Sequence, residues 1–172
     1  TADRQQDIVV SVLPVFLFLL ALVILDSYKL VKLPEVGGTI IFGALSAVVA
    51  LFLNTFIAQY LPRGMHIMPR YVAPVTEELL KSVFVIYLIR SGKVGLLVDA
   101  AIHGFAAGAG FAFMENVYYL KTVGGNSTTL VWLIRGFGTA VMHGGTAAIM
   151  AIIIKNLAER SSSPRLWHIA PG

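Results

Sequence analysis

Five apolar stretches, each close to the length of a membrane-spanning helix, dominate this sequence. They cover residues 8–25, 39–61, 74–89, 94–120 and 128–155. A bilayer core about 30 Å thick is crossed by a helix of about 20 apolar residues. Hydrophobic residues make up 57% of the 172 and charged residues only 13%, against about 25% charged in a soluble domain. The sequence therefore predicts an all-α protein, a polytopic bundle of about five transmembrane helices.

The remaining segments are short and polar. We expect residues 1–157 to form a single transmembrane domain and the serine-rich residues 158–172 to form an exposed tail. The chain has no cysteine, which rules out a disulfide or a thiolate metal site. The net charge of +4 fits basic loops that face the anionic lipid bilayer and gives no sign of a nucleic-acid partner.

Basic residues are divided unevenly between the two sides that five spans would create. The loops on the N-terminal side contain Arg63, Arg70 and Lys121. The opposite side would carry the larger group: Lys29, Lys32, Arg90, Lys93, Lys155, Arg160 and Arg165. Because cytoplasmic loops are enriched in lysine and arginine, we expect the C-terminus in the cytoplasm and the N-terminus outside it.

Three charged residues, Glu77, Glu78 and Lys81, lie in the first two turns of the third predicted span. An ionisable side chain at mid-membrane costs about 2.5–3.5 kcal/mol on insertion scales, so such residues are rare and usually functional. The i,i+4 and i,i+3 spacings let the lysine reach either glutamate. The group is either a structural ion cluster or a set of carboxylates held where water can reach them. Since adjacent helical residues diverge by about 100°, we expect the two glutamates to differ in role.

Two further polar residues are predicted at the same depth as this pair. Glu115 lies about five residues, roughly 7 Å, from the end of the fourth span, on the side where the third span begins. His143 lies about 12 Å below Arg135, if Arg135 marks the interface. Read singly, the acid could be a snorkelling surface group and the histidine a hydrogen-bonded core residue; their common depth favours one cluster. His103, about 18 Å from Glu115 along one helix, is predicted to be structural.

Three segments resemble, in order, the motifs of the PrsW-type intramembrane proteases, relatives of the CAAX prenyl endopeptidases in the ABI superfamily. They are Ala-Pro-x-x-Glu-Glu-x-x-Lys at 73–81, Phe-x-x-x-Glu-Asn at 111–116 and an Arg-to-His segment at 135–143. The resemblance covers residues 65–154 and implies a protease domain in the plasma membrane. The catalytic residues that it implies are Glu77, Glu78, Glu115 and His143, with Lys81, Asn116 and Arg135 in support. It also implies cleavage of a single-pass membrane protein, such as an anti-sigma factor, on the extracytoplasmic side.

The resulting hypothesis is hydrolysis of a peptide bond without a covalent intermediate. Glu77 would act as general base on a water molecule, and Glu78 with Lys81 would orient it. His143 would stabilise the oxyanion or hold the water. A metal-dependent variant is also predicted, in which Glu78, Glu115 and His143 bind one zinc ion and leave a position open for water.

Three other functions are alternatives to peptide hydrolysis by this mechanism. Buried glutamate, lysine and histidine also form proton relays in transporters, but the second half of the third span is almost wholly apolar. The prenyl endopeptidases usually carry a histidine where this chain has Glu115, and an asparagine where it has Ala147. This departure argues against prenylated substrates and leaves Asn116 as the candidate for an asparagine contact to the oxyanion. A catalytically silent membrane scaffold is the third alternative.

Overall fold

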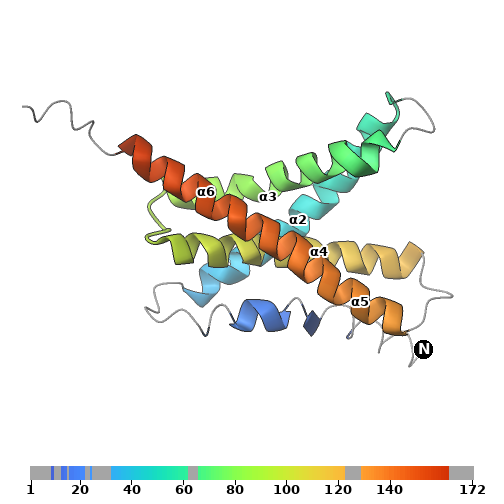
Figure 1. The fold of residues 1–172 in the computed structure, drawn as a ribbon, viewed down its shortest axis with the longest axis horizontal. Coiled ribbons are helices and arrows are strands. Elements are labelled where there is room, and N and C mark those ends of the chain that lie inside the picture. Colours follow the sequence, from blue (N-terminus) through green and yellow to red (C-terminus); the bar gives the residue numbers. More distant parts are fainter. Residues whose placement is uncertain are drawn as a thin grey trace, which may run out of the picture.

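The computed structural model describes residues 32–61, 66–122 and 129–162, together with positions 9, 13–14, 16–21 and 24. Its helices are α2 (Leu33–Ala58), α3 (Ala73–Arg90), α4 (Leu97–Thr122), α5 (Thr129–Thr139) and α6 (Gly145–Ser162). Two π-helical turns, η1 (Met68–Val72) and η2 (Ala140–Gly144), run directly into α3 and α6. Every element in the described part of the chain is helical (Figure 1), which confirms the predicted all-α class.

Three helical segments are long and apolar enough to cross a membrane. They are Leu33–Ala58, Leu97–Thr122 and Leu130–Arg160, and the last runs through α5, η2 and α6 as one rod. The 18-residue α3 is more polar, since it carries the charged pair of glutamates, Lys81 and Arg90. The first predicted span, residues 8–25, falls partly outside the described residues; the positions described there are helical, and Leu19 packs into the core. The predicted helical membrane bundle is confirmed.

Several helix boundaries differ from the sequence-based expectation. Helix α2 begins at Leu33 rather than at residue 39, because Pro34 is compatible with a first helical turn and Glu35 there complements the helix dipole. The chain before the third predicted span is helical from Met68 onward, ahead of the predicted start at residue 74. The last helix continues to Ser162, so the beginning of the predicted tail is helical.

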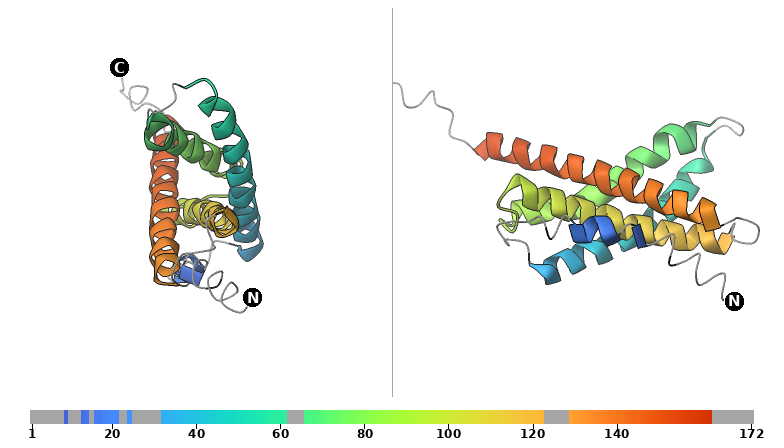
Figure 2. Two further views of the ribbon diagram at one scale, coloured as in Figure 1. Left: turned by 90° about the vertical axis from the view of Figure 1, so that its right-hand side faces the viewer. Right: turned by 60° about the horizontal axis from the view of Figure 1, so that its bottom comes forward.

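Helix α4 is the central element of the bundle (Figure 2), and it packs against α2, α3, α6 and η2. Its middle consists of small residues, among which Ala100, Ala106, Ala107, Ala109 and Ala112 are completely buried. Small side chains let neighbouring backbones approach closely, which is the main source of helix association in lipid.

Glycines mark the closest of these approaches. A Cβ atom on Gly43 would overlap the backbone of Ala107, and one on Gly108 would overlap the backbone of His143. A Cβ on Gly104 would lie 2.5 Å from the carbonyl oxygen of Ala147. The small-residue faces of α4, η2 and α6 are therefore packing surfaces. They fix α4 and η2, and hence Glu115 and His143, relative to each other.

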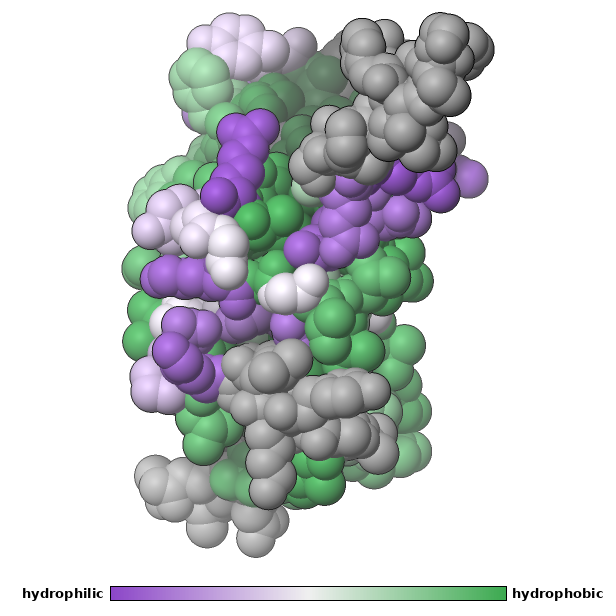
Figure 3. Space-filling view, turned by 90° about the vertical axis from the view of Figure 1, so that its left-hand side faces the viewer, coloured by the Kyte–Doolittle hydropathy of each residue, from purple (hydrophilic) through white to green (hydrophobic). Residues whose placement is uncertain are grey.

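The two ends of the bundle differ in character. At one end, the C-terminal part of α2 and the beginning of α3 diverge from the end of α4 and the beginning of α5 (right-hand side of Figure 1). At the other end, hydrophilic side chains gather between hydrophobic flanks (Figure 3), and Lys32, Arg90, Lys93 and Arg160 are exposed there. The predicted site residues lie toward the diverging end.

Candidate active site

The structure joins three of the four predicted catalytic residues through one buried lysine. The Nζ atom of Lys81 lies 2.5 Å from Glu78 Oε1 and 3.1 Å from His143 Nδ1. The other ring nitrogen of His143, Nε2, lies 2.7 Å from Glu115 Oε2. Arg135 completes the chain with a 3.2 Å hydrogen bond from Nη2 to Glu115 Oε1. Residues from α3, α4, α5 and η2 thus meet at one depth, as their positions along the helices predict.

His143 owes its placement to the π-helical turn η2. A π turn adds one residue to a helical turn, and such turns occur frequently at functional sites. The glycines that follow, Gly144 and Gly145, have low helix propensity and so favour a departure from the regular α-helical ladder. The turn lies directly against Gly108 of α4. His143 is only 4% exposed, so its ring is held among neighbouring helices.

Glu77 and Glu78 point to different sides of α3, as adjacent helical residues must. Glu78 faces α6, where the hydroxyl of Thr146 donates a 2.8 Å hydrogen bond to its Oε1. Glu77 faces α2, where Asn54 Nδ2 lies 3.4 Å from its Oε1. Thr76 donates to Asn54 Oδ1 at 2.6 Å, which leaves the amide nitrogen directed toward the carboxylate. The two glutamates therefore have different partners and different surroundings.

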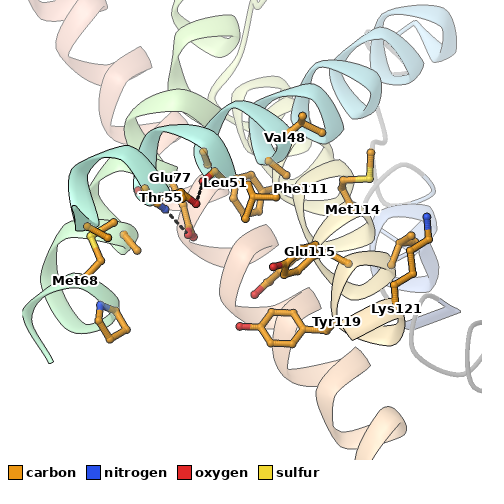
Figure 4. A pocket seen from close by; sticks show the side chains of 18 residues that line it. Val48, Leu51, Thr55, Met68, Glu77, Phe111, Met114, Glu115, Tyr119 and Lys121 are labelled. Carbon is orange, nitrogen blue, oxygen red and sulfur yellow. Dashed lines mark hydrogen bonds between the residues drawn. The ribbon is translucent and has the colours of Figure 1, made fainter. Parts of the chain in front are cut away.

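A cavity of about 480 Å³ lies beside this cluster, at the diverging end of the bundle. Its walls come from the C-terminal half of α2, from η1 and the beginning of α3, and from the last part of α4. Of the four predicted catalytic residues, Glu77 and Glu115 line it, and Figure 4 shows these two carboxylates on opposite walls. Glu78 and His143 do not line it. The cluster is thus divided into a pair that faces the cavity and a group that lies behind it.

Phe111 forms the wall between these two layers. Its ring lines the cavity, while Lys81 Nζ lies 4.7 Å and the His143 ring 5.0 Å from its centre. Lys81 is 1% exposed. Ions in such a position cannot be solvated by water, so their hydrogen-bonding partners must satisfy them.

Arg135 and Tyr119 hold Glu115 from the other side. The guanidinium carbon of Arg135 lies 3.8 Å from the centre of the Tyr119 ring, which fixes the arginine by a cation–π contact. Both oxygens of Glu115 are then occupied, one by Arg135 and one by His143. Phe111 is the first residue of the second sequence motif, but the motif gives it no role. Nothing in the sequence singles out Tyr119, because single aromatic residues are common on apolar helices.

Asn116 and His103 lie outside the cavity wall. Asn116 is fully buried and donates a 3.0 Å hydrogen bond to Thr139, so it ties α4 to α5 instead of reaching an oxyanion in the cavity. His103 is 1% exposed, and its Nδ1 lies 2.9 Å from the hydroxyl of Thr39 on α2. The structural role predicted for His103 fits this contact. Asn54 of α2 forms hydrogen bonds with α3 and also lines the cavity.

The residues predicted to bind zinc do not form a ligand set in this arrangement. The ammonium of Lys81 lies between Glu78 and His143, and both ring nitrogens of His143 are hydrogen-bonded. Glu78 Oε2 is buried without a hydrogen-bonding partner in the described structure, but the crevice next to it leaves no room for a water molecule. Within residues 32–61, 66–122 and 129–162, no three histidine or carboxylate side chains converge as metal ligands. Lys81 supplies positive charge where a metal ion would have to lie.

One comparison with known proteins gave a match. A family model described as PrsW family intramembrane metalloprotease matches residues 33–172, which include every predicted catalytic residue. No curated protein and no solved structure gave a match. The family match covers most of the chain and confirms the resemblance drawn from the three motifs. This chain is therefore an integral membrane protein that belongs to the PrsW family of intramembrane proteases.

Proposed function

We propose that the protein hydrolyses a peptide bond of a membrane-anchored protein with a water molecule activated by Glu77. One observation carries this proposal: Glu77 and Glu115, from two different helices, face the same cavity, while the buried Lys81 and the partly exposed Arg135 hold the neighbouring side chains. Paired carboxylates at a cavity are suited to moving protons to and from water.

Glu77 is the better candidate for the general base. Both oxygens of Glu115 are already bonded, to Arg135 and His143. Glu77 is half-buried, and its one hydrogen bond in the described structure is the long contact to Asn54. It therefore has a free oxygen to accept a proton from water, while Glu115 orients that water from the opposite wall.

The reaction can be written with these residues alone. Glu77 removes a proton from the water, whose oxygen bonds to the carbonyl carbon of the peptide and forms a tetrahedral oxyanion. The second N–H of Asn54, whose amide is oriented by Thr76, can donate to that oxyanion. Glu77 then returns the proton to the amide nitrogen, the C–N bond breaks, and a carboxylic acid and an amine are formed. The acid passes its proton to the amine, so that a carboxylate and an ammonium ion leave. No step passes through a metal ion, because the predicted ligands are not arranged to hold one.

His143 and Lys81 act as positioning residues in this scheme. His143 holds Glu115 through its Nε2, and Lys81 holds both His143 and Glu78. This replaces the direct contact with the oxyanion or the water that the sequence predicts for His143.

We further propose that the substrate is a single-pass membrane protein, such as an anti-sigma factor, cleaved on the extracytoplasmic side of the plasma membrane. The cavity lies at the end of the bundle opposite the exposed basic residues Lys32, Arg90 and Lys93. If that basic end faces the cytoplasm, the cavity faces outward and the N-terminus lies outside. Residues 1–157 would then act as one protease domain.

A proton-conducting function fits the described structure less well. The residues of α4 between His103 and Glu115 are all glycine, alanine, phenylalanine or methionine, so no polar path continues along the central helix. A conduit would need polar groups through the full depth of the membrane.

Reconstituted protein and candidate single-pass substrates test the proposal. We expect Glu77→Gln to lower kcat by about 10²- to 10⁴-fold, the usual contribution of a general base. Glu115→Gln and His143→Ala should also lower kcat, because the first removes the second carboxylate and the second releases it from His143. Glu78→Gln should mainly lower the free energy of unfolding, because Glu78 pairs with the buried Lys81. Cleavage by Glu77→Gln at the wild-type rate would refute the assignment of the base.

A further inference from the structure

The cavity wall has a composition that selects one kind of peptide segment. We propose that the cavity binds a short extended stretch of the substrate and seats a large apolar side chain next to the bond that is cleaved. This inference rests on the proposed function, since it concerns the substrate of the same site.

The size of the cavity limits what can enter it. One turn of an α-helix with its side chains is about 10–12 Å wide and 5.4 Å long, and so occupies roughly 500 Å³. The cavity of about 480 Å³ is therefore of the size of a few residues and does not enclose a whole membrane-spanning helix. A helix keeps its carbonyl groups hydrogen-bonded, so we expect the substrate to be extended where a free peptide bond lies between Glu77 and Glu115.

The chemistry of the walls favours an apolar side chain beside the reacting bond. Val48 and Leu51 of α2 face Phe111 and Met114 of α4 across the space next to the carboxylates (Figure 4). Ala50 is small and 2% exposed, so it adds depth at the base of this wall. Burying a side chain of the size of leucine or phenylalanine there contributes about 1.5–3 kcal/mol. A peptide is the occupant that also makes use of the two carboxylates and the amide of Asn54.

One face of α2 forms this wall, and the neighbouring face does not. Leu51 lines the cavity, whereas Leu53, two residues farther along the helix, does not. The two leucines are almost equally exposed in the structure, at 41% and 38%. They therefore form a matched pair in which only the direction of the side chain differs.

Binding can be tested without catalysis, because the chain has no cysteine of its own. Leu51→Cys and Leu53→Cys are each made in the Glu77→Gln background and reconstituted in phosphatidylethanolamine–phosphatidylglycerol liposomes. Synthetic single-span peptides with one cysteine at successive positions are added, and the mixture is mildly oxidised. We expect disulfides from position 51 at least tenfold above those from position 53, confined to three or four successive peptide positions. Equal labelling, or none at either position, would overturn the inference, and a cavity filled by a lipid chain would give that result.

Specificity is tested with Leu51→Trp and its matched control Leu53→Trp. Peptides carry Ala, Leu or Phe beside the cleaved bond, and kcat/KM is measured for each. Filling the cavity should lower the preference for Phe over Ala at least tenfold in Leu51→Trp, within the 10- to 200-fold that apolar pockets provide. Leu53→Trp should keep the wild-type preference. A uniform loss of activity in Leu51→Trp, with the preference unchanged, would refute an apolar side-chain site.

The two proposals fail in different ways. If Glu77→Gln cleaves like the wild type while the cross-links from position 51 persist, the assigned base is wrong and the binding site stands. If Glu77→Gln is inactive but positions 51 and 53 behave alike, the base stands and the cavity is not the binding site.

Discussion

Lys81 is the residue that distinguishes this cluster from an ordinary ion pair on a helix surface. An exposed glutamate–lysine pair at i,i+3 stabilises a helix by only about 0.2–0.5 kcal/mol. Lys81 is 1% exposed and also contacts His143 and the ring of Phe111. Breaking a buried pair leaves an uncompensated charge, which costs about 3–5 kcal/mol.

Lys81→Met should therefore destabilise the protein strongly. We expect a loss of about 3–5 kcal/mol, measured as unfolding in detergent. The double variant Lys81→Met/Glu78→Gln should regain part of this loss, because it removes the unpaired carboxylate as well. The matched control is Lys155→Met, which breaks the 3.3 Å pair with the half-exposed Glu159 and should cost less than about 1 kcal/mol. Equal losses in Lys81→Met and Lys155→Met would contradict a buried, structural role for Lys81.

At the level of elements, the contact between α4 and η2 decides where His143 lies. Gly108 has no room for a Cβ atom, because the backbone of His143 occupies that space. The π turn and the glycine together bring the imidazole within reach of Glu115 on the same central helix.

Gly108→Ala should separate α4 from η2 and displace His143. We expect a destabilisation of about 1–3 kcal/mol from overpacking. We also expect kcat to fall by about 10²-fold, the cost that a 1 Å misplacement near the reacting groups can have. Gly138→Ala is the control, because a Cβ there meets nothing within 4 Å. If both variants retain full activity, the close approach of α4 and η2 does not position the site.

At the level of the whole molecule, the buried lysine makes the cluster independent of a bound metal ion in our proposal. We expect activity of the reconstituted protein to survive exhaustive chelation and to be unchanged when zinc is added back. Metal content measured on the same samples provides the control. Activity that disappears on chelation and returns with zinc would show that Lys81 and His143 rearrange to release their mutual contact.

The proposed orientation is tested by labelling at the two ends of the bundle. Ser91→Cys and Gln59→Cys place single cysteines at exposed positions at opposite ends of α3 and α2. A maleimide that cannot cross membranes should label Gln59→Cys in intact cells and Ser91→Cys only after permeabilisation. The reverse pattern would place the cavity on the cytoplasmic side.

The sequence by itself determined the class of fold and the membership of the cluster. Apolar runs near 20 residues must form helices in a bilayer, because backbone groups in lipid have no other partners. The fixed rise of 1.5 Å per residue then placed Glu77, Glu78, Glu115 and His143 at a common depth. The ends of the helices were less predictable, as the early start of α2 and the helical turn η1 show. Polar residues there suggest a loop, whereas a proline at the first helical positions is compatible with a helix.

Only the tertiary structure decided which of these residues faces the cavity. Hydropathy and spacing give the depth of a side chain but not its neighbours on other helices. Those neighbours depend on how closely the helices approach and how each is rotated, which the backbone contacts at Gly43, Gly104 and Gly108 set. For the same reason, the sequence could not show that Lys81 lies between Glu78 and His143, or that Glu77 and Glu115 form the two walls of one cavity.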